Sequence, residues 1–184
     1  MPITTQSIEG VNFSAIYTAY DQTAAISSTN SPDNPGPPFA VGTVMNATDG
    51  SIWMFAKASG GINQYDVVMI DPTFLSAKQI VGGATPEAPK MRIGFYQNAT
   101  ALVANNYAWF MQSGVPTINV LGSCVKNVQL YTTNTSGALD DAATTASQFP
   151  IRSVYLTTTI SSTTASFNTA QASFPTIGPL GALN

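Results

Sequence analysis

The sequence predicts an all-β protein, built as an antiparallel β-sandwich or barrel-like domain with an extended N-terminal arm and a C-terminal tail. Short apolar runs recur between turn signals at the spacing typical of sandwiches and barrels. Long helical periodicity is missing after residue 39. Hydrophobic residues make up 44% of the chain and charged residues only 8%, which suits a β-rich body with a largely neutral surface.

Residues 1–38 are expected to form an N-terminal arm and a proline-rich connector. Phe13, Tyr17 and Tyr20 recur at roughly helical spacing, but the Ser, Thr and Asn residues around them are poor helix formers. The same residues therefore fit an extended arm. The four prolines of segment 31–38 (SPDNPGPP) fix φ and remove backbone donors, so we place the boundary of the β core there.

Residues 39–160 are expected to form the β core domain. The turn Thr48-Asp49-Gly50 predicts a hairpin. The segment 139–147 is a candidate for one helical turn, with Asp140 and Asp141 near its N-terminus. The predicted strands cover residues 41–47, 51–58, 65–71, 76–80, 91–97, 107–113, 116–123, 125–132 and 151–160.

Residues 161–184 are expected to form a C-terminal tail, because they lack a dense hydrophobic pattern. Phe167 and Phe174 make this tail too apolar to remain free in water. We expect it to lie against the core or against a neighbouring molecule.

The segment 107–114 (YAWFMQSG) is apolar on both faces of a strand, with Tyr107, Trp109 and Met111 on one face and Ala108 and Phe110 on the other. A sheet with one wet face would alternate apolar with polar residues. Something must therefore cover the second face. We expect the arm, the tail or another subunit to do so, and the alternative is that loops of the same chain provide all of the cover.

The residue types present exclude several chemistries. The chain has no histidine, which removes Ser-His-Asp and Cys-His arrangements and most zinc sites. Cys124 is the single cysteine and is expected to act as a small buried hydrophobe. Asp140 and Asp141 are the only adjacent acids and are interpreted as a solvated turn or helix start. We therefore expect no enzyme, no cofactor and no metal.

Charge and hydropathy argue against two classes of partner, nucleic acids and membranes. Six basic residues and an isoelectric point of about 4.5 disfavour nucleic-acid binding. Lys90 and Arg92 share a strand face and are interpreted as solvated. No apolar run is long enough for a transmembrane helix, and no secretory signal is recognised, so we expect synthesis in the cytoplasm and no membrane partner.

Five segments follow one another in a recognisable order: 50–59 (GSIWMFAKAS), 62–71 (INQYDVVMID), 92–99 (RIGFYQNA), 106–114 (NYAWFMQSG) and 130–141 (LYTTNTSGALDD). This succession resembles the head decoration, or capsid cement, proteins that tailed bacteriophages encode beside their capsid genes. The resemblance implies a β domain on the outer capsid surface, often a homotrimer, that stabilises the head lattice through non-covalent contacts with the major capsid protein. It therefore implies a place in the virion.

Aromatic side chains of the arm and the tail are the candidates for such contacts, because aromatic residues that become buried in an interface often dominate its binding energy. The candidate interface residues are Phe13, Tyr17 and Tyr20 in the arm and Phe167 and Phe174 in the tail. The alternative is that these rings pack on their own core.

Two other functions fit the same sequence. One is a different virion component, namely a tail, fibre or spike-base subunit. The other is a carbohydrate-binding β module in which Trp53, Trp109 and Tyr107 stack against sugars.

Overall fold

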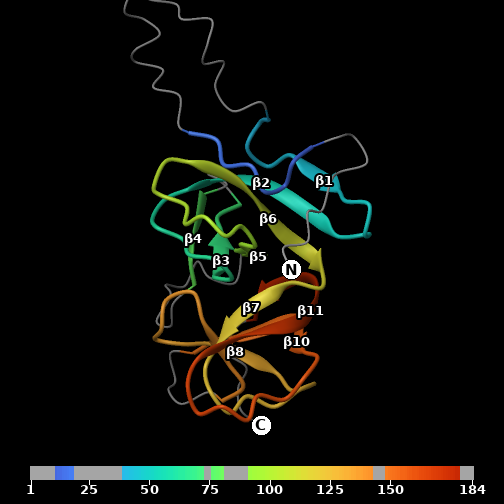
Figure 1. Cartoon of the computed structure of the whole chain (residues 1–184), viewed down its shortest axis with the longest axis vertical. Coiled ribbons are helices and arrows are strands. Elements are labelled where there is room, and N and C mark those ends of the chain that lie inside the picture. The colour runs from blue at the N-terminus through green and yellow to red at the C-terminus, as the bar shows by residue number, and fades with distance from the viewer. Residues whose placement is uncertain (1–10, 19–38, 73–75, 81–90, 143–147, 179–184) are drawn as a thin grey trace, which may run out of the picture.

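The structure is a computed structural model that describes residues 11–18, 39–72, 76–80, 91–142 and 148–178. The predicted all-β fold is confirmed: eleven strands join in one hydrogen-bonded sheet (Figure 1). Within these ranges no helix is long and apolar enough to cross a bilayer. The strands are β1 (Val44–Asn46), β2 (Ile52–Ala58), β3 (Val67–Ile70), β4 (Ser76–Gln79), β5 (Arg92–Phe95), β6 (Tyr107–Gly114), β7 (Thr117–Val120), β8 (Leu130–Thr132), β9 (Leu139–Asp140), β10 (Pro150–Leu156) and β11 (Ser166–Ile177).

The strand pairings close into two rings. In the first ring β2 pairs with β4, β4 with β3, β3 with β5, β5 with β6, and β6 returns to β2. In the second ring β7, β9, β8, β10 and β11 pair in that order, and β11 returns to β7. Figure 1 shows the first ring in the upper half of the molecule and the second in the lower half. Strand β11 joins the rings, because it also pairs with β5 and β6.

The hairpin predicted at Thr48-Asp49-Gly50 is confirmed. Gly50 has a φ of +82° and donates its N–H to the Ala47 carbonyl at 3.0 Å, and β1 pairs antiparallel with β2 on either side of the turn. The predicted helical turn at 139–147 is wrong at its start. Leu139–Asp140 is strand β9, because Leu139 is buried and pairs with Val120 of β7.

The expectation of a C-terminal tail is wrong for the part that the structure describes. Residues Ser166–Ile177 form β11, the longest strand, which contacts four other strands. Its buried face carries Ala170, Ala172 and Ile177, and its other positions are mostly exposed. Two of these inward positions are alanines, so the apolar alternation is weak in the sequence although the burial is complete.

Both faces of strand β6 are buried by the chain itself. Trp109 and Met111 belong to the main core cluster, which extends from Trp53 in the first ring to Leu156 in the second. Ala108 and Phe110 belong to a second cluster with Met54, Ala56, Val68 and Ile70.

The second cluster is completed by Ile62, Tyr96 and Leu102, which lie in the connections that follow β2 and β5. Ile62 and Leu102 exchange backbone hydrogen bonds of 2.9 and 2.8 Å and are almost fully buried. Ile16 of the expected arm also packs against this cluster, so the arm and the loops of the same chain together cover this face. Cover by the arm was among the expectations, whereas the expectation that another subunit is needed is wrong.

Candidate functional site

Phe13, a candidate interface residue of the arm, lies in the core of its own chain. Its side chain is only 3% exposed. The ring stacks on Trp53 at a centroid distance of 4.9 Å and meets Trp109 edge-on at 5.2 Å. The interface role expected for Phe13 is therefore replaced by a packing role within the chain.

Tyr17, the second arm candidate, is held by β6 and is half-buried. The Tyr17 and Tyr107 backbones exchange hydrogen bonds of 2.9 and 2.8 Å, so this part of the arm extends the sheet. The Tyr17 ring lies edge-on to Phe39 and Phe55. Burial raises the pKa of the Tyr17 hydroxyl. Residues 11–18 are thus part of the core domain, and the boundary expected at residue 38 does not separate them from it; Tyr20 lies outside the described residues.

Phe167 and Phe174, the candidates of the expected tail, are both on the surface of β11. Phe167 is 60% exposed and Phe174 is 52% exposed. The Phe167 ring lies 5.0 Å from the ring of Tyr65. Phe174 has a φ of +46° and lies where the register of β10 against β11 shifts, which turns it outward at a bulge. These two rings are therefore presented by a strand held on both sides.

The aromatic rings considered for carbohydrate stacking are packed against other rings. Trp53 and Trp109 are 3% and 1% exposed, and the Trp53 indole N–H donates to the Ser51 hydroxyl at 2.7 Å. Tyr107 stacks on Phe55 at 5.8 Å. Neither indole offers a free face to a sugar, so this set of residues does not form a stacking platform.

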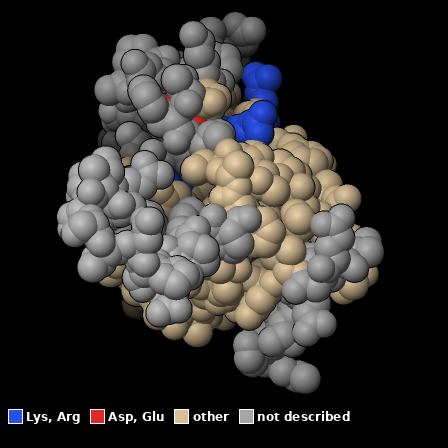
Figure 2. All heavy atoms as spheres, turned by 90° about the horizontal axis from the view of Figure 1, so that it is seen from above, with Lys and Arg blue, Asp and Glu red and all other residues tan. Residues whose placement is uncertain are grey.

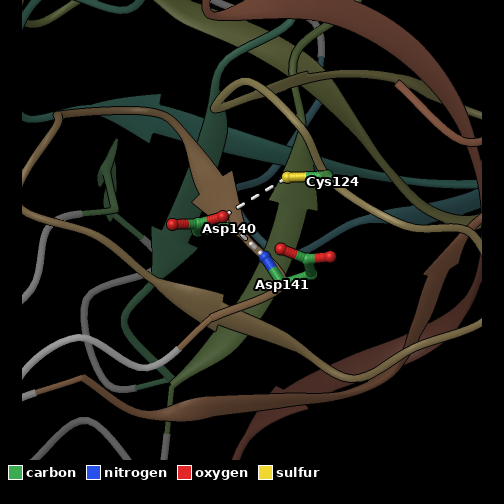
Figure 3. A group of neighbouring side chains, drawn as sticks. All are labelled: Cys124, Asp140 and Asp141. Atoms are coloured by element: carbon green, nitrogen blue, oxygen red, sulfur yellow. Dashed lines mark hydrogen bonds between the residues drawn. The ribbon is translucent and has the colours of Figure 1, made fainter. Parts of the chain in front are cut away.

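Cys124 lies beside Asp140 and Asp141 in the second ring (Figure 3). The expectation that Cys124 is buried is confirmed. Its thiol contacts the Leu121 carbonyl at 3.2 Å and Asp140 Oδ1 at 3.4 Å. Burial is the main cause that raises the pKa of this thiol to about 12, so it stays protonated at neutral pH.

The two carboxylates of this group accept backbone hydrogen bonds. Asp141 Oδ2 accepts the Val125 N–H at 2.6 Å, and Asp140 Oδ1 accepts the Asp141 N–H at 2.8 Å. Both residues are half-buried and are not the solvated pair that the sequence indicated. The protonated thiol and the two hydrogen-bonded carboxylates hold the connection after β7 against β9. We therefore assign this group a structural role.

Two arginines share one row of the sheet, which the sequence did not indicate. Arg92 of β5 is paired with Thr176 of β11, and Thr176 is paired with Arg152 of β10. All three residues are exposed. The sequence reasoning paired Arg92 with Lys90 instead, and Lys90 lies outside the described residues. The three residues are far apart along the chain, so only the register of β11 brings them together.

Large apolar side chains remain exposed around the molecule, and three of them are aromatic. They are Val44, Val103, Val115, Val125, Val128, Tyr155, Phe167 and Phe174. Figure 2 shows that the molecule seen from above is mainly neutral where it is described. Such a surface is suited to contacts with other protein surfaces more than to chemistry on a small molecule.

Comparison with known proteins adds no family assignment to this geometry: no protein-family model matches the chain, and no curated protein matches it either.

Proposed function

We propose that this protein is a structural component of a virion, which binds the outer surface of a tailed-bacteriophage head and stabilises its lattice through non-covalent contacts. The observation that carries the proposal is the exposure of Phe167 and Phe174 on β11. This strand is fixed by four neighbouring strands. Aromatic side chains on a rigid scaffold lose little conformational freedom on binding and bury a large area.

A folded domain with exposed aromatic side chains and a low net charge is suited to binding a repeating protein lattice. Specific interfaces bury about 1,200–2,000 Å², and repetition over a closed shell multiplies modest contacts by avidity. A formal net charge of only −3 on 184 residues limits repulsion between neighbouring copies. The proposed partner is the major capsid protein, and the proposed oligomer is a homotrimer; both follow from the sequence resemblance.

Binding of the purified protein to heads that lack it tests this proposal. Heads assembled from the major capsid protein of the same genome are sedimented with the full-length chain, and the bound fraction is measured. We expect saturable binding, a weaker binding for the double variant Phe167→Ser/Phe174→Ser, and unchanged binding for Val103→Ser, a matched control with another exposed apolar side chain. Failure of the wild-type chain to bind heads would contradict the proposal.

Antibody labelling of intact virions separates the proposed function from its main alternative. Label over the head supports a decoration or cement protein. Label confined to the tail would contradict it and would support a tail, fibre or spike-base subunit. The oligomeric state is measured independently by sedimentation velocity.

A further inference from the structure

Three strands bring two positive charges to one exposed face of the sheet. Arg92, Thr176 and Arg152 occupy the same row of β5, β11 and β10. Residues paired across antiparallel strands point to the same side of the sheet. Since neighbouring strands lie about 4.8 Å apart, the backbones of the two arginines are about 10 Å apart, with the Thr176 hydroxyl between them.

Neither guanidinium contacts a carboxylate in the described parts of the chain. Arg92 Nη1 lies 4.0 Å from the sulfur of Met54, and Arg152 Nε lies beside Gly178. The acids in the described residues, Asp49, Asp66, Asp71, Asp140 and Asp141, each have interactions of their own. Within the described residues, two exposed arginines therefore have no acidic partner, on a chain whose net charge is negative.

Exposed aromatic side chains lie on β11 and β10, the strands that carry Thr176 and Arg152. Phe174 is two residues from Thr176 on β11, and Tyr155 of β10 is 42% exposed and paired with Gln171. Arginine and aromatic residues are the types most enriched at the energetic centres of protein interfaces. Arginine forks bind carboxylates in a bidentate geometry, and a threonine hydroxyl supplies a further donor. The face thus combines anion recognition with apolar contact area.

We infer that this β5–β11–β10 face, formed by Arg92, Thr176, Arg152, Phe174 and Tyr155, docks an acidic segment of a partner protein. Carboxylates of that segment lie between the two guanidiniums, and an apolar side chain of the same segment covers Phe174. Charge complementarity selects this occupant. A nucleic acid is disfavoured, because two cations on an acidic chain neutralise too few phosphates. The identification of the segment with the capsid surface rests on the proposed function, whereas its chemistry does not.

A peptide titration tests the docking chemistry without capsids. The probe is a ten-residue peptide of alternating glutamate and leucine, added to the full-length ¹⁵N-labelled chain. We expect the Nε–Hε signals of Arg92 and Arg152 and the amide signal of Thr176 to shift, and 500 mM NaCl to weaken binding. The double variant Arg92→Gln/Arg152→Gln should bind at least tenfold more weakly, and the control Lys57→Gln/Lys126→Gln within twofold of wild type.

Several outcomes would overturn the inference. Shifts confined to other parts of the molecule would do so, and so would equal losses in the two double variants. Inorganic phosphate that shifts the same signals at the same concentration as the peptide would show an unspecific anion site. The amide spectrum reports whether each variant is folded, and Arg92→Lys/Arg152→Lys, which keeps the charge but loses the fork, should bind with intermediate strength.

Head binding then separates this inference from the proposed function. If wild-type chain fails to bind heads but the peptide shifts both arginine signals, the proposed function fails and the docking face stands. If the Arg92→Gln/Arg152→Gln variant binds heads as well as wild type does, the acidic segment is not part of the capsid surface, and the proposed function stands.

Discussion

Strands β6 and β11 are neighbours in one sheet but are buried to different extents. Residues 108–112 of β6 are all buried, whereas β11 alternates between buried and exposed positions over most of its length. They pair directly, Ala172 with Gly114 and Ser173 with Ser113. Beyond the sheet, β6 is covered by Phe13 on one face and by the loops around Ile62 and Leu102 on the other. No described residue covers the exposed side of Phe174 in this way.

The difference separates two uses of apolar side chains. Around β6 they stabilise the fold, and the chain itself supplies the cover, so association is not needed to hide them. On β11 the rings of Phe167 and Phe174 are more than half exposed and remain available to a partner. Apolar composition alone is therefore not a sign of assembly, and the position of each ring relative to its own loops decides its role.

The comparison is tested most strongly by matched truncation of one phenylalanine on each strand. Phe110→Ala removes a fully buried ring of the second cluster and should lower the free energy of unfolding by about 3–5 kcal/mol. Phe174→Ala removes a half-exposed ring and should change it by no more than about 0.5 kcal/mol. Guanidinium chloride unfolding, followed by tryptophan fluorescence, measures both. Similar losses in the two variants would remove the distinction between the strands.

The arm is tested by Phe13→Ala. Loss of the stacked contact with Trp53 and the edge contact with Trp109 should lower the free energy of unfolding by about 2–4 kcal/mol and make the indoles accessible to acrylamide. Fluorescence quenching and denaturant unfolding provide the two measurements. An unchanged stability together with unchanged quenching would show that the arm is not part of the core.

The junction of the two rings is tested by Gly137→Ala. Gly137 has a φ of +78°, and an added Cβ would clash with the Asp66 carboxylate. We expect a loss of about 1–3 kcal/mol, since the backbone strain and the clash add. Gly50→Ala is the matched control, because Gly50 has a φ of +82° but no neighbour within 4 Å of the added Cβ. Equal losses for Gly137→Ala and Gly50→Ala in thermal or denaturant unfolding would mean that the expected clash with Asp66 adds nothing to the backbone strain.

Unfolding at alkaline pH tests a smaller contribution to stability, that of buried groups that stay protonated in the folded protein. The pKa of Cys124 is raised from 9.0 to about 12 by burial, and burial also raises the pKa of Tyr96. Because the folded-state pKa of Cys124 is higher than the unfolded one, its contribution to stability is complete below pH 9 and is lost between about pH 9 and 12. Cys124→Ala should therefore lose less stability than wild type across this interval. If the free energies of unfolding of wild type and Cys124→Ala fall in parallel between pH 9 and 12, the raised pKa of Cys124 is contradicted.

Much of the fold is predictable from the sequence because the local signals are strong. The strands from residue 41 to 132 lie within their predicted ranges, except that β6 extends one residue further to Gly114, since apolar runs end at turn residues such as Gly50. Strand β11 is missed because Ala170 and Ala172 fill its buried positions, and alanine gives no clear alternation. A bulge at Phe174 disturbs the remaining pattern.

The candidate site is less predictable, because it depends on contacts between distant residues. The sequence identifies Phe167 and Phe174 as apolar but does not indicate that both are exposed on a strand. It also does not reveal that Phe13 packs on Trp53. The pairing of Arg92 and Arg152 through Thr176 follows from strand register, which no local pattern encodes.

The most direct measurement is a cryo-electron microscopy map of heads that carry the protein. We predict that the β5–β11–β10 face, with Arg92, Phe174 and Arg152, faces the capsid shell, and that the loops around Ile62 and Leu102 do not contact the shell. A map in which β11 faces solvent and those loops contact the shell would contradict this account.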